Sequence, residues 1–385
     1  MLNRYIRIGF RSIAGAIARL QQKIIYLACF LTVPAAIWAA PNTLPPANLT
    51  ITLSAGVTSV EIQQALDLLT NGGQVLLPPG KIKVSQPIVL DRNNQSLIGD
   101  SRRHTTLYLV NNANCPVIIM GQPVNRPMHT VRHLSVSNLF IDGNRAHQQR
   151  ELWREQGEGS EIRNNGITVQ NVSDSTIENV TCTRCRSGGL VTTLGVRRLT
   201  VDNFNSFNNQ FDGLACYLTM DSVFNHLYLH DNPGAGISLD LDFDHNRIKN
   251  AVLAANDLGI FMRDSRKNQF DNLSIRKNRD FGIFMAQAFE TYARGMQPQP
   301  DTECTDNSFT SLVDVENGQA AFRVNDISCT NNIIIDPQFA GSVRAISTAG
   351  PDLVTVINGP GWRTLTASTG TPFSRNAPLP SPSIF

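Results

Sequence analysis

Short apolar segments that open on a small residue recur along the chain at a nearly constant spacing. They begin at intervals of 23 or 24 residues, at Gly166, Gly189, Gly213, Gly236, Gly259 and Gly282. Ala321 takes the same place 39 residues later, after one period and a 16-residue insertion. A fixed period in this range is typical of a solenoid, in which each coil packs only against its neighbours. The pattern therefore predicts an all-β solenoid with coils of about 23 residues.

A row of polar residues runs in phase with these segments, thirteen or fourteen residues after each opening glycine once the insertion is discounted. Its members are Asn138, Asn179, Asn203, His226, Asn250, Asn272 and Ser311. Polar residues that recur at one bend, between apolar positions, suit an internal hydrogen-bonded stack that caps backbone groups of the turn. We therefore assign His226 to this structural ladder rather than to catalysis.

The region before the repeat predicts a cap for the solenoid. Thr58 and Glu61 have the spacing of a capping box at the start of a short helix that ends at Gly72-Gly73. The apolar face expected for this helix consists of Val60, Ala65, Leu66 and Leu69. Short strand-like runs follow at 74–77, 81–84, 88–90 and 97–98. Because an open end of stacked strands exposes unpaired backbone groups, we expect the helix to cover that end.

The stretch from Gly236 to Asp244 alternates strictly between apolar and polar residues. As a single strand it would place Asp240, Asp242 and Asp244 on one outward face, with alternate residues about 6.6–6.8 Å apart. Neighbouring strands are about 4.8 Å apart, so the glycine register also places Tyr217 and Arg263 on either side of Asp240. Clustered like charges need compensation, which makes this face a candidate site.

These residues suit acid–base chemistry on a charged sugar. Arg263 would neutralise or orient the substrate, while Tyr217 and Asp240 would exchange protons. Asp242 would assist a water molecule or bind a cation. In a hydrolase, Asp240 and Asp242 would instead be acid and base, since inverting glycosidases place their carboxyls about 6.5–9.5 Å apart. The three aspartates could also hold Ca²⁺, although His245 and Ala251 exclude an EF-hand loop.

Six further residues are candidates for substrate binding. Phe261 and Phe284 are expected to be exposed and to stack on a sugar face. Trp153 lies in the inserted segment 146–164, which we interpret either as a wall of the binding surface or as a solvated loop. The others are Arg145, Asp244 and His245.

The amino terminus indicates export. Residues 1–40 of this 385-residue chain carry five basic and no acidic residues, and an apolar run ends at Ala39-Ala40. This layout predicts a cleaved signal peptide or an uncleaved membrane anchor, with the protein periplasmic or secreted. Removing the five charges takes the formal net charge from +2 to −3. No basic surface is implied, which argues against a nucleic-acid partner.

Six cysteines follow the leader. Cys182 and Cys185 lack a second such pair, so we interpret them as core or turn residues, with metal or redox chemistry as the alternative. Cys304 and Cys329 fall on adjacent coils and form the best disulfide candidate.

The glycine-led strands, the asparagine ladder and the segment Leu139-Phe140-Ile141-Asp142-Gly143-Asn144-Arg145 together resemble a right-handed parallel β-helix of the pectate-lyase-like superfamily. Residues 141–145 and 209–224 are similar to the catalytic modules of secreted alginate C5-epimerases. The catalytic Asp, His and second Asp of that pattern are missing here, where Val191, Thr193 and Tyr217 stand. The resemblance implies the fold and a polysaccharide substrate, but not the epimerase mechanism.

The sequence thus predicts a leader at 1–40, a right-handed parallel β-helix at 41–345 and a carboxy-terminal extension at 346–385. The expected function is an exported monomer that acts on a polysaccharide, with a uronate polymer as one candidate, by lyase- or epimerase-type proton abstraction. An inverting glycoside hydrolase and a non-catalytic polysaccharide-binding envelope protein are the alternatives. No cofactor is expected apart from the Ca²⁺ alternative.

Overall fold

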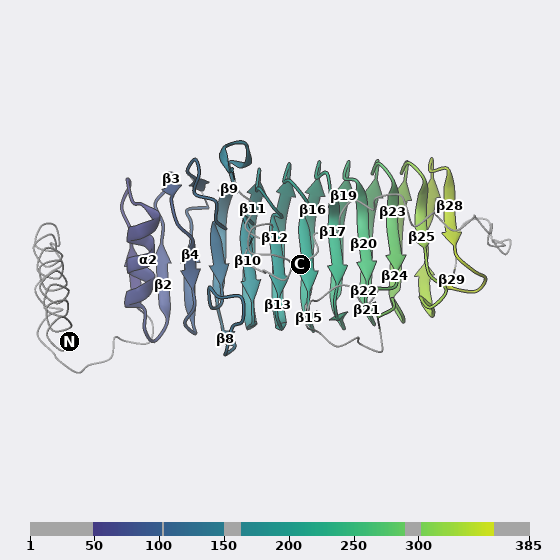
Figure 1. The fold of residues 1–385 in the computed structure, drawn as a ribbon, viewed down its shortest axis with the longest axis horizontal. Coiled ribbons are helices and arrows are strands. Elements are labelled where there is room, and N and C mark those ends of the chain that lie inside the picture. Colours follow the sequence, from purple (N-terminus) through teal and green to yellow (C-terminus); the bar gives the residue numbers. More distant parts are fainter. Residues whose placement is uncertain (1–48, 102–103, 150–162, 289–301, 358–385) are drawn as a thin grey trace, which may run out of the picture. The chain divides into compact units, whose positions relative to one another are not determined.

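The computed structural model describes residues 49–101, 104–149, 163–288 and 302–357, and in these the chain coils into a parallel β-helix (Figure 1). The expected leader at 1–40 lies outside the described residues. Among the described residues, no helix is long and apolar enough to cross a membrane. The all-β solenoid predicted from the repeat is confirmed.

In the described residues, the strands form two sheets that run along the axis of the solenoid. The ten-stranded sheet contains β4 (Ile88–Leu90), β7 (Ile118–Met120), β10 (Ile167–Gln170), β12 (Leu190–Thr193), β14 (Leu214–Tyr217), β17 (Ala235–Asp240), β20 (Leu258–Arg263), β23 (Phe281–Ala286), β25 (Ala320–Val324) and β28 (Arg344–Thr348). These are the glycine-led segments of the repeat, together with the strands that extend the sheet at either end.

The second sheet has nineteen strands within the described part of the chain and supplies the other walls of the coil. It contains β1 (Leu49–Thr52), β2 (Gly73–Leu76), β3 (Gly80–Val84), β5 (Gln95–Ile98), β6 (Thr105–Leu109), β8 (Val131–Arg132), β9 (Ser135–Asp142), β11 (Val172–Thr183), β13 (Val196–Phe207), β15 (Thr219–Met220), β16 (Val223–His230), β18 (Phe243–Asp244), β19 (Arg247–Ala254), β21 (Ser265–Arg266), β22 (Gln269–Arg276), β24 (Ser308–Val315), β26 (Asn332–Ile335), β27 (Gln338–Ala340) and β29 (Val354–Ile357).

The register within the ten-stranded sheet is the one predicted from the glycine spacing. Leu214 pairs with Ile237, Ile260 with Ile283, and Ile283 with Phe322 across the insertion. The side chains at these paired positions point inward and are completely buried. The fixed period therefore places apolar residues one above another in a continuous core.

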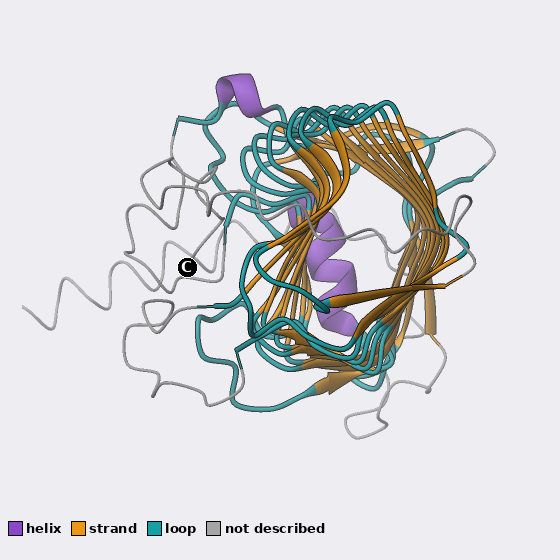
Figure 2. Cartoon of the chain, turned by 90° about the vertical axis from the view of Figure 1, so that its right-hand side faces the viewer, coloured by secondary structure: helices purple, strands orange, loops and turns teal. Residues whose placement is uncertain are grey.

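The amino-terminal cap is present as expected, although its helix ends at Leu68 rather than at Gly72-Gly73. Helix α2 (Ser59–Leu68) lies at the amino-terminal end of the stack, and a view along the axis shows it crossing the bore (Figure 2). The Glu61 carboxylate accepts a hydrogen bond of 2.8 Å from the Thr58 amide, which confirms the capping box. Ile62, Ala65 and Leu66 are buried, whereas Val60 is 41% exposed, so its assignment to the apolar face was wrong.

The stretch from Gly236 to Asp244 is not one strand, contrary to the sequence-based expectation. β17 ends at Asp240, Leu241 and Asp242 both have left-handed backbone conformations with φ of 50° and 56°, and β18 then joins the other sheet. The preceding coil has one left-handed residue here, Leu218, and the following coil has one, Asp264. Asp242 is therefore an extra residue in the corner, and the alternation of faces does not continue through it.

The predicted asparagine ladder exists, but it lies mostly at the surface. Its members all have positive φ, and the Nδ2 groups of Asn203 and Asn272 donate 2.8 Å hydrogen bonds to the ladder residues of the preceding coils, Asn179 and Asn250. The expectation of an internal stack was wrong because these side chains leave an outward bend. Asparagine suits this bend because it tolerates the left-handed conformation.

Two internal ladders were not anticipated. In each, an asparagine Oδ1 accepts hydrogen bonds from both the backbone N–H and the Nδ2 of the asparagine one coil before, at 2.9–3.3 Å. These buried side chains satisfy turn backbone groups that water cannot reach. The ladders are Asn209, Asn232, Asn256, Asn278 and Asn317, and Asn246, Asn268, Asn307 and Asn332.

One inward column of the core contains a carboxyl group. Asp314 is completely buried between Ile275 and Phe339 in the strand register, and Asn317 donates a hydrogen bond to its Oδ1. Burial raises the pKa of Asp314 well above its usual range. Gly282 packs against this carboxyl, since a Cβ added there would lie 2.2 Å from Oδ1.

The β-helix extends past the expected boundary at residue 345. β28 pairs with β25, and β29 pairs with β26, so the coils continue to Ile357. The sequence pattern missed these residues because the glycine-led repeat ends before them. The remainder of the expected extension, 358–385, lies outside the described residues.

Candidate functional site

Tyr217, Asp240 and Arg263 lie side by side on three neighbouring strands, as the glycine register predicts. Tyr217 pairs with Asp240, and the pairing of Leu239 with Met262 continues the row to Arg263. Arg263 Nε donates a 3.1 Å hydrogen bond to Asp240 Oδ2, and Nη2 donates to the same oxygen. The other oxygen of Asp240 accepts the Leu241 amide at 3.0 Å.

This row is closed to solvent. Tyr217, Asp240 and Arg263 are 4%, 1% and 3% exposed. Burial raises the pKa of Asp240, and the positive charge and hydrogen bonds of Arg263 oppose that rise. The pair is thus a buried ion pair whose partners neutralise one another, which differs from the open substrate-facing row expected from the sequence.

Phe261 and Phe284 are not the exposed surface that the sequence suggests, since each is only 6% exposed. Their rings stack at 5.8 Å between centroids and pack in an apolar cluster with Leu258 and Phe281. The Arg263 guanidinium lies 4.9 Å from the Phe261 centroid. In the observed structure, Phe261 therefore supports the arginine, and sugar stacking on either ring is not supported by their burial.

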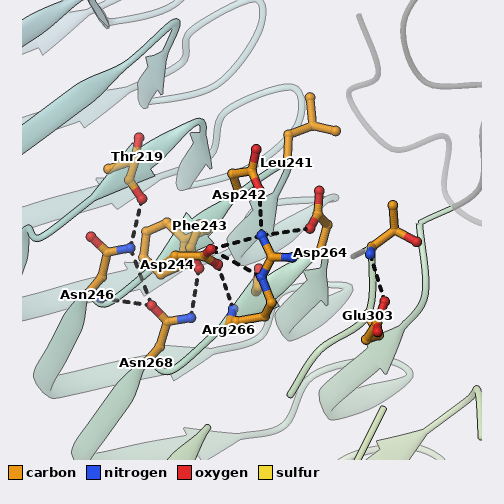
Figure 3. A network of polar contacts seen from close by, with 12 residues as sticks. Thr219, Leu241, Asp242, Phe243, Asp244, Asn246, Asp264, Arg266, Asn268 and Glu303 are labelled. Atoms are coloured by element: carbon orange, nitrogen blue, oxygen red, sulfur yellow. Dashed lines mark hydrogen bonds and ion pairs between the residues drawn. The ribbon is translucent and has the colours of Figure 1, made fainter. Parts of the chain in front are cut away.

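A second cluster lies where the chain turns from the ten-stranded sheet into β18 and β21, and it centres on Arg266 (Figure 3). Arg266 Nη2 contacts Asp242 and donates to Asp244 Oδ2 at 2.9 Å, while the Arg266 amide donates to Asp244 Oδ1 at 2.8 Å. Asp264 Oδ1 lies 3.6 Å from the same Nη2. Three carboxyl groups thus share one guanidinium, and we call these four residues the corner cluster.

Two residues of this cluster, Arg266 and Asp264, were not among the candidates predicted from the sequence, and Asp264 is the more deeply buried of the two. Its side chain is 3% exposed, and burial together with the nearby Asp242 charge raises its pKa to about 7, although Arg266 acts in the opposite direction. The side chain of Asp242 is 31% exposed. The cluster therefore combines an accessible carboxylate with a buried carboxyl that titrates near neutral pH.

The geometry removes the basis for the hydrolase alternative. Asp240 and Asp242 do not project from alternate positions of one strand, because the strand ends at Asp240 and both Leu241 and Asp242 have left-handed backbone conformations. Asp240 binds Arg263, whereas Asp242 binds Arg266. A water molecule held between these two carboxyls, as an inverting glycosidase requires, is therefore not supported.

The calcium alternative also lacks a suitable donor set. In the described part of the chain, no group of three or more His, Cys, Asp or Glu side chains is arranged to hold a metal ion. The carboxylates of Asp240, Asp242 and Asp244 instead face guanidinium groups. A cation would have to displace these partners, so the residues do not fit Ca²⁺.

The remaining predicted binding residues are dispersed. His245 is exposed beside the corner cluster, and its amide donates to the Arg266 carbonyl at 3.1 Å. Arg145 begins the short 3₁₀ helix η3 (Arg145–His147) and donates to the Asn209 carbonyl at 2.7 Å, without a contact to the corner cluster among the described residues. Trp153 lies outside the described residues.

The cysteine predictions meet different outcomes. Cys182 and Cys185 are completely buried in the core, as the structural interpretation expects. Cys304 and Cys329 are neighbours, since the Cys304 amide lies 3.4 Å from Cys329 Sγ, but both are free thiols in this structure. Their adjacency is confirmed and the disulfide remains a prediction.

Comparison with known proteins supports the fold. Residues 129–255 match a family described as the right-handed β-helix region, which covers about a third of the chain. No curated protein sequence matches the chain significantly. The right-handed parallel β-helix predicted from the sequence is therefore confirmed at the level of fold.

Solved structures with this fold include proteins of several kinds. ORF18 of Geobacillus virus E2 is 14% identical with a TM-score of 0.62, and the alignment covers 90% of this chain and 65% of the viral protein. A rhamnogalacturonan lyase is 12% identical with a TM-score of 0.58, covering 81% of this chain and 87% of the lyase. The A-module of an Azotobacter vinelandii mannuronan C-5 epimerase is 15% identical with a TM-score of 0.52, covering 77% and 95%. At these identities the similarity shows the fold alone.

Proposed function

We propose that this protein is exported and acts on a uronate-containing polysaccharide by proton abstraction, as a lyase or an epimerase does. The observation that carries the proposal is the corner cluster, in which a carboxyl with a pKa of about 7 lies beside an accessible carboxylate and a guanidinium. Proton-transfer catalysis is most efficient when the pKa of the group lies near the working pH. Solved structures with the same fold include polysaccharide lyases and epimerases.

The roles within the cluster follow from accessibility and charge. Asp242 meets the substrate and exchanges the proton, because it is the most exposed of the three carboxyls. Arg266 faces the charge that develops on the uronate. Asp264 is a positioning residue that keeps a proton near Asp242 at neutral pH. Asp240 and Arg263, which the sequence suggested as reacting groups, hold the strand before the corner.

The test is an assay of the purified protein on polygalacturonate and alginate. A lyase gives an unsaturated product that absorbs in the ultraviolet, and an epimerase inverts C5 without chain cleavage, which proton NMR detects. Asp242→Asn should lower kcat by about 10²–10⁴-fold, the usual contribution of a general acid or base. Asp271→Asn is the matched control, because Asp271 is similarly exposed and binds Arg247 elsewhere.

A pH profile separates the role of Asp264 from a purely structural one. The parent activity should change between about pH 6 and 8, and Asp264→Asn should remove that transition while retaining the fold. Equal activity of Asp242→Asn and the parent on every polymer that the parent converts would refute the site assignment.

The second candidate is a non-catalytic protein that binds polysaccharide. The burial of Tyr217, Asp240 and Arg263 favours this function. These residues form the row predicted to react with the substrate, but Asp240 and Arg263 form a buried ion pair instead. Binding of a uronate polymer with no product by either absorbance or NMR would select this function.

The proposed location outside the cytoplasm rests on the basic and apolar residues of 1–40. Fractionation of cells that express the full chain, with amino-terminal sequencing of the exported form, tests it. A free amino terminus at 40 or 41 identifies a cleaved signal, and retention in the membrane with an intact leader identifies an anchor. Recovery only in the cytoplasm would contradict export.

A further inference from the structure

A second set of chemically suggestive side chains lies on the nineteen-stranded sheet, on strands other than β18 and β21 of the corner cluster. The strand segments that follow the surface asparagine ladder, together with β3 and β6, place alternate residues in two parallel rows on the outer side of the coil. All members are at least partly exposed except Asp142 and Thr183, which are buried. One row is Lys81, Thr106, Phe140, Thr181, Asn205, Tyr228, Val252 and Ser274. The other is Lys83, Tyr108, Asp142, Thr183, Phe207, His230, Ala254 and Arg276. We call these two rows the aromatic–cationic strip.

The middle of the strip is an aromatic platform. The rings of Tyr228 and His230 stack with centroids 4.2 Å apart, and His230 stacks on Phe207 at 4.9 Å with nearly parallel planes. Tyr228 is 43% exposed, which is unusual for a large side chain on a strand of this solenoid. Asp231 Oδ2 lies 2.6 Å from His230 Nδ1 and fixes the orientation of that ring.

The side chains next to this platform on the following coil are small. Val252 and Ala254 are the paired neighbours of Tyr228 and His230 on the next coil, and they are much smaller. The exposed side of the aromatic rings is therefore not covered by their neighbours in the strand register. A planar, partly apolar ligand such as a sugar ring could pack there, since aromatic rings provide large contact area with little conformational entropy to lose.

Positive charge lies at both ends of the strip. Lys81 and Lys83 are exposed at its amino-terminal end, where Lys81 Nζ is 3.4 Å from the Tyr108 ring centroid. Arg276 is exposed at its carboxy-terminal end. None of these three cations forms an ion pair with a carboxylate among the described residues. The carboxylate within the strip, Asp142, is neutralised by Arg184.

We propose that the aromatic–cationic strip binds an extended anionic polysaccharide, with sugar rings on the Tyr228–His230 platform and carboxylates near Lys81, Lys83 and Arg276. The strip crosses eight neighbouring strands, from β3 to β22, and is about 34 Å long at about 4.8 Å per strand. It thus accommodates several sugar units of one chain. The cations and the aromatic platform together favour a polyanion over a neutral glycan.

The strip deepens the proposed function, because it would hold the same class of polymer at a surface distinct from the corner cluster. It rests on the proposed function only for the choice of polymer. Binding can be measured without turnover, so its outcome is separate from that of the activity assay. In particular, Asp242→Asn should leave binding at the strip intact even if it abolishes the reaction.

The experiment measures the affinity of the full chain for polygalacturonate and alginate, with dextran as the neutral comparison, by titration calorimetry at low and high salt. Tyr228→Ala should weaken binding of the polyanion about three- to tenfold, the range of a lost aromatic contact. Tyr228→Phe keeps the ring and should bind like the parent. Arg276→Ala should also weaken binding and reduce its salt dependence, whereas Arg247→Ala, an exposed arginine paired with Asp271, should do neither.

Three results would overturn the inference. The first is equal affinity for the polyanions and dextran. The second is an affinity that Tyr228→Ala and Arg276→Ala leave unchanged while circular dichroism shows intact folds. The third is concentration-dependent self-association of the parent, in sedimentation, that these two variants abolish, because the strip would then bind a second copy of the chain.

Discussion

Arg263→Met isolates the energetic role of the buried ion pair with Asp240. The variant leaves Asp240, which is 1% exposed, without the guanidinium that donates two hydrogen bonds to it. Removing one partner of a buried pair costs about 3–5 kcal/mol, because the remaining charge must be protonated or stay desolvated. We therefore expect Arg263→Met to lower the free energy of unfolding by about that amount.

The double variant with Asp240→Asn provides the control. An asparagine at 240 can still accept the Leu241 amide, which now binds Asp240 Oδ1 at 3.0 Å. Because replacement of a whole buried ion pair is often close to neutral, the double variant should be more stable than Arg263→Met alone. The double-mutant cycle should give a coupling of about 2 kcal/mol or more.

The pH dependence has a defined sign. Burial raises the pKa of Asp240, and loss of Arg263 removes the effect that opposes this rise. A raised pKa in the folded state contributes stability that is present below the unfolded pKa and is lost as pH rises through the folded value. Arg263→Met should therefore lose more stability than the parent as the pH rises above the unfolded pKa of about 4.

Urea denaturation measures these effects on global stability. Amide hydrogen exchange of β17 and β20 measures them locally, because a solenoid can open at one coil without unfolding as a whole. Additive single-variant costs, each below about 1 kcal/mol, would show that the two charges are not coupled and would refute the argument. The same double variant tests the site, since the proposed chemistry at Asp242 predicts that it retains activity.

Three further predictions concern the coils. Asp314→Asn should reduce the loss of stability that the parent shows as the pH rises, because the buried carboxyl has a raised pKa and is present only in the parent. Urea midpoints at acidic and alkaline pH measure this. An equal dependence of the midpoint on pH in the parent and the variant would contradict it. Gly282→Ala should lower the free energy of unfolding by about 1–3 kcal/mol, since the new Cβ would collide with Asp314 Oδ1 and the Ala321 carbonyl. Gly350→Ala is the control, because a Cβ there would lie 3.4 Å from its nearest neighbour and should leave stability unchanged in the same assay. Asn256→Ala should lower the free energy of unfolding by about 1–3 kcal/mol, because it leaves buried donors of Asn232 unpaired. Asn250→Gly, in the surface ladder, should lower it clearly less. Equal urea midpoints for the two variants would argue against the stabilising role of the buried ladder.

The register of the ten-stranded sheet was predictable because it depends on a count. Each coil returns to the same place after a fixed number of residues, so the spacing of Gly213, Gly236 and Gly259 places Tyr217, Asp240 and Arg263 in one row. The capping box was predictable for a similar reason, since Thr58 and Glu61 act locally.

The corner cluster was not predictable from alternation. Asp242 is an extra left-handed residue, and no local rule separates an alternating strand from one that bends at such a corner. A similar corner occurs two coils earlier, where Leu194 and Gly195 are both left-handed. That coil is one residue longer than its neighbours, so its sequence indicates that a corner can hold an extra residue. Asp264 was missed because it takes the corner position held by Leu218 and Leu241 in the preceding coils.

The sequence by itself determined the solenoid, the order of its coils and the amino-terminal cap. It also determined which residues are neighbours on the outer face of the ten-stranded sheet. These follow from periodicity and local hydrogen bonding. Only the tertiary structure decided which of those outward residues are open to solvent, where the chain turns out of the sheet, and which carboxyl belongs to which guanidinium. Burial and ion pairing depend on segments far apart in the chain. They removed Tyr217, Asp240 and Arg263 from the candidate chemistry, kept Asp242, and added Asp264 and Arg266.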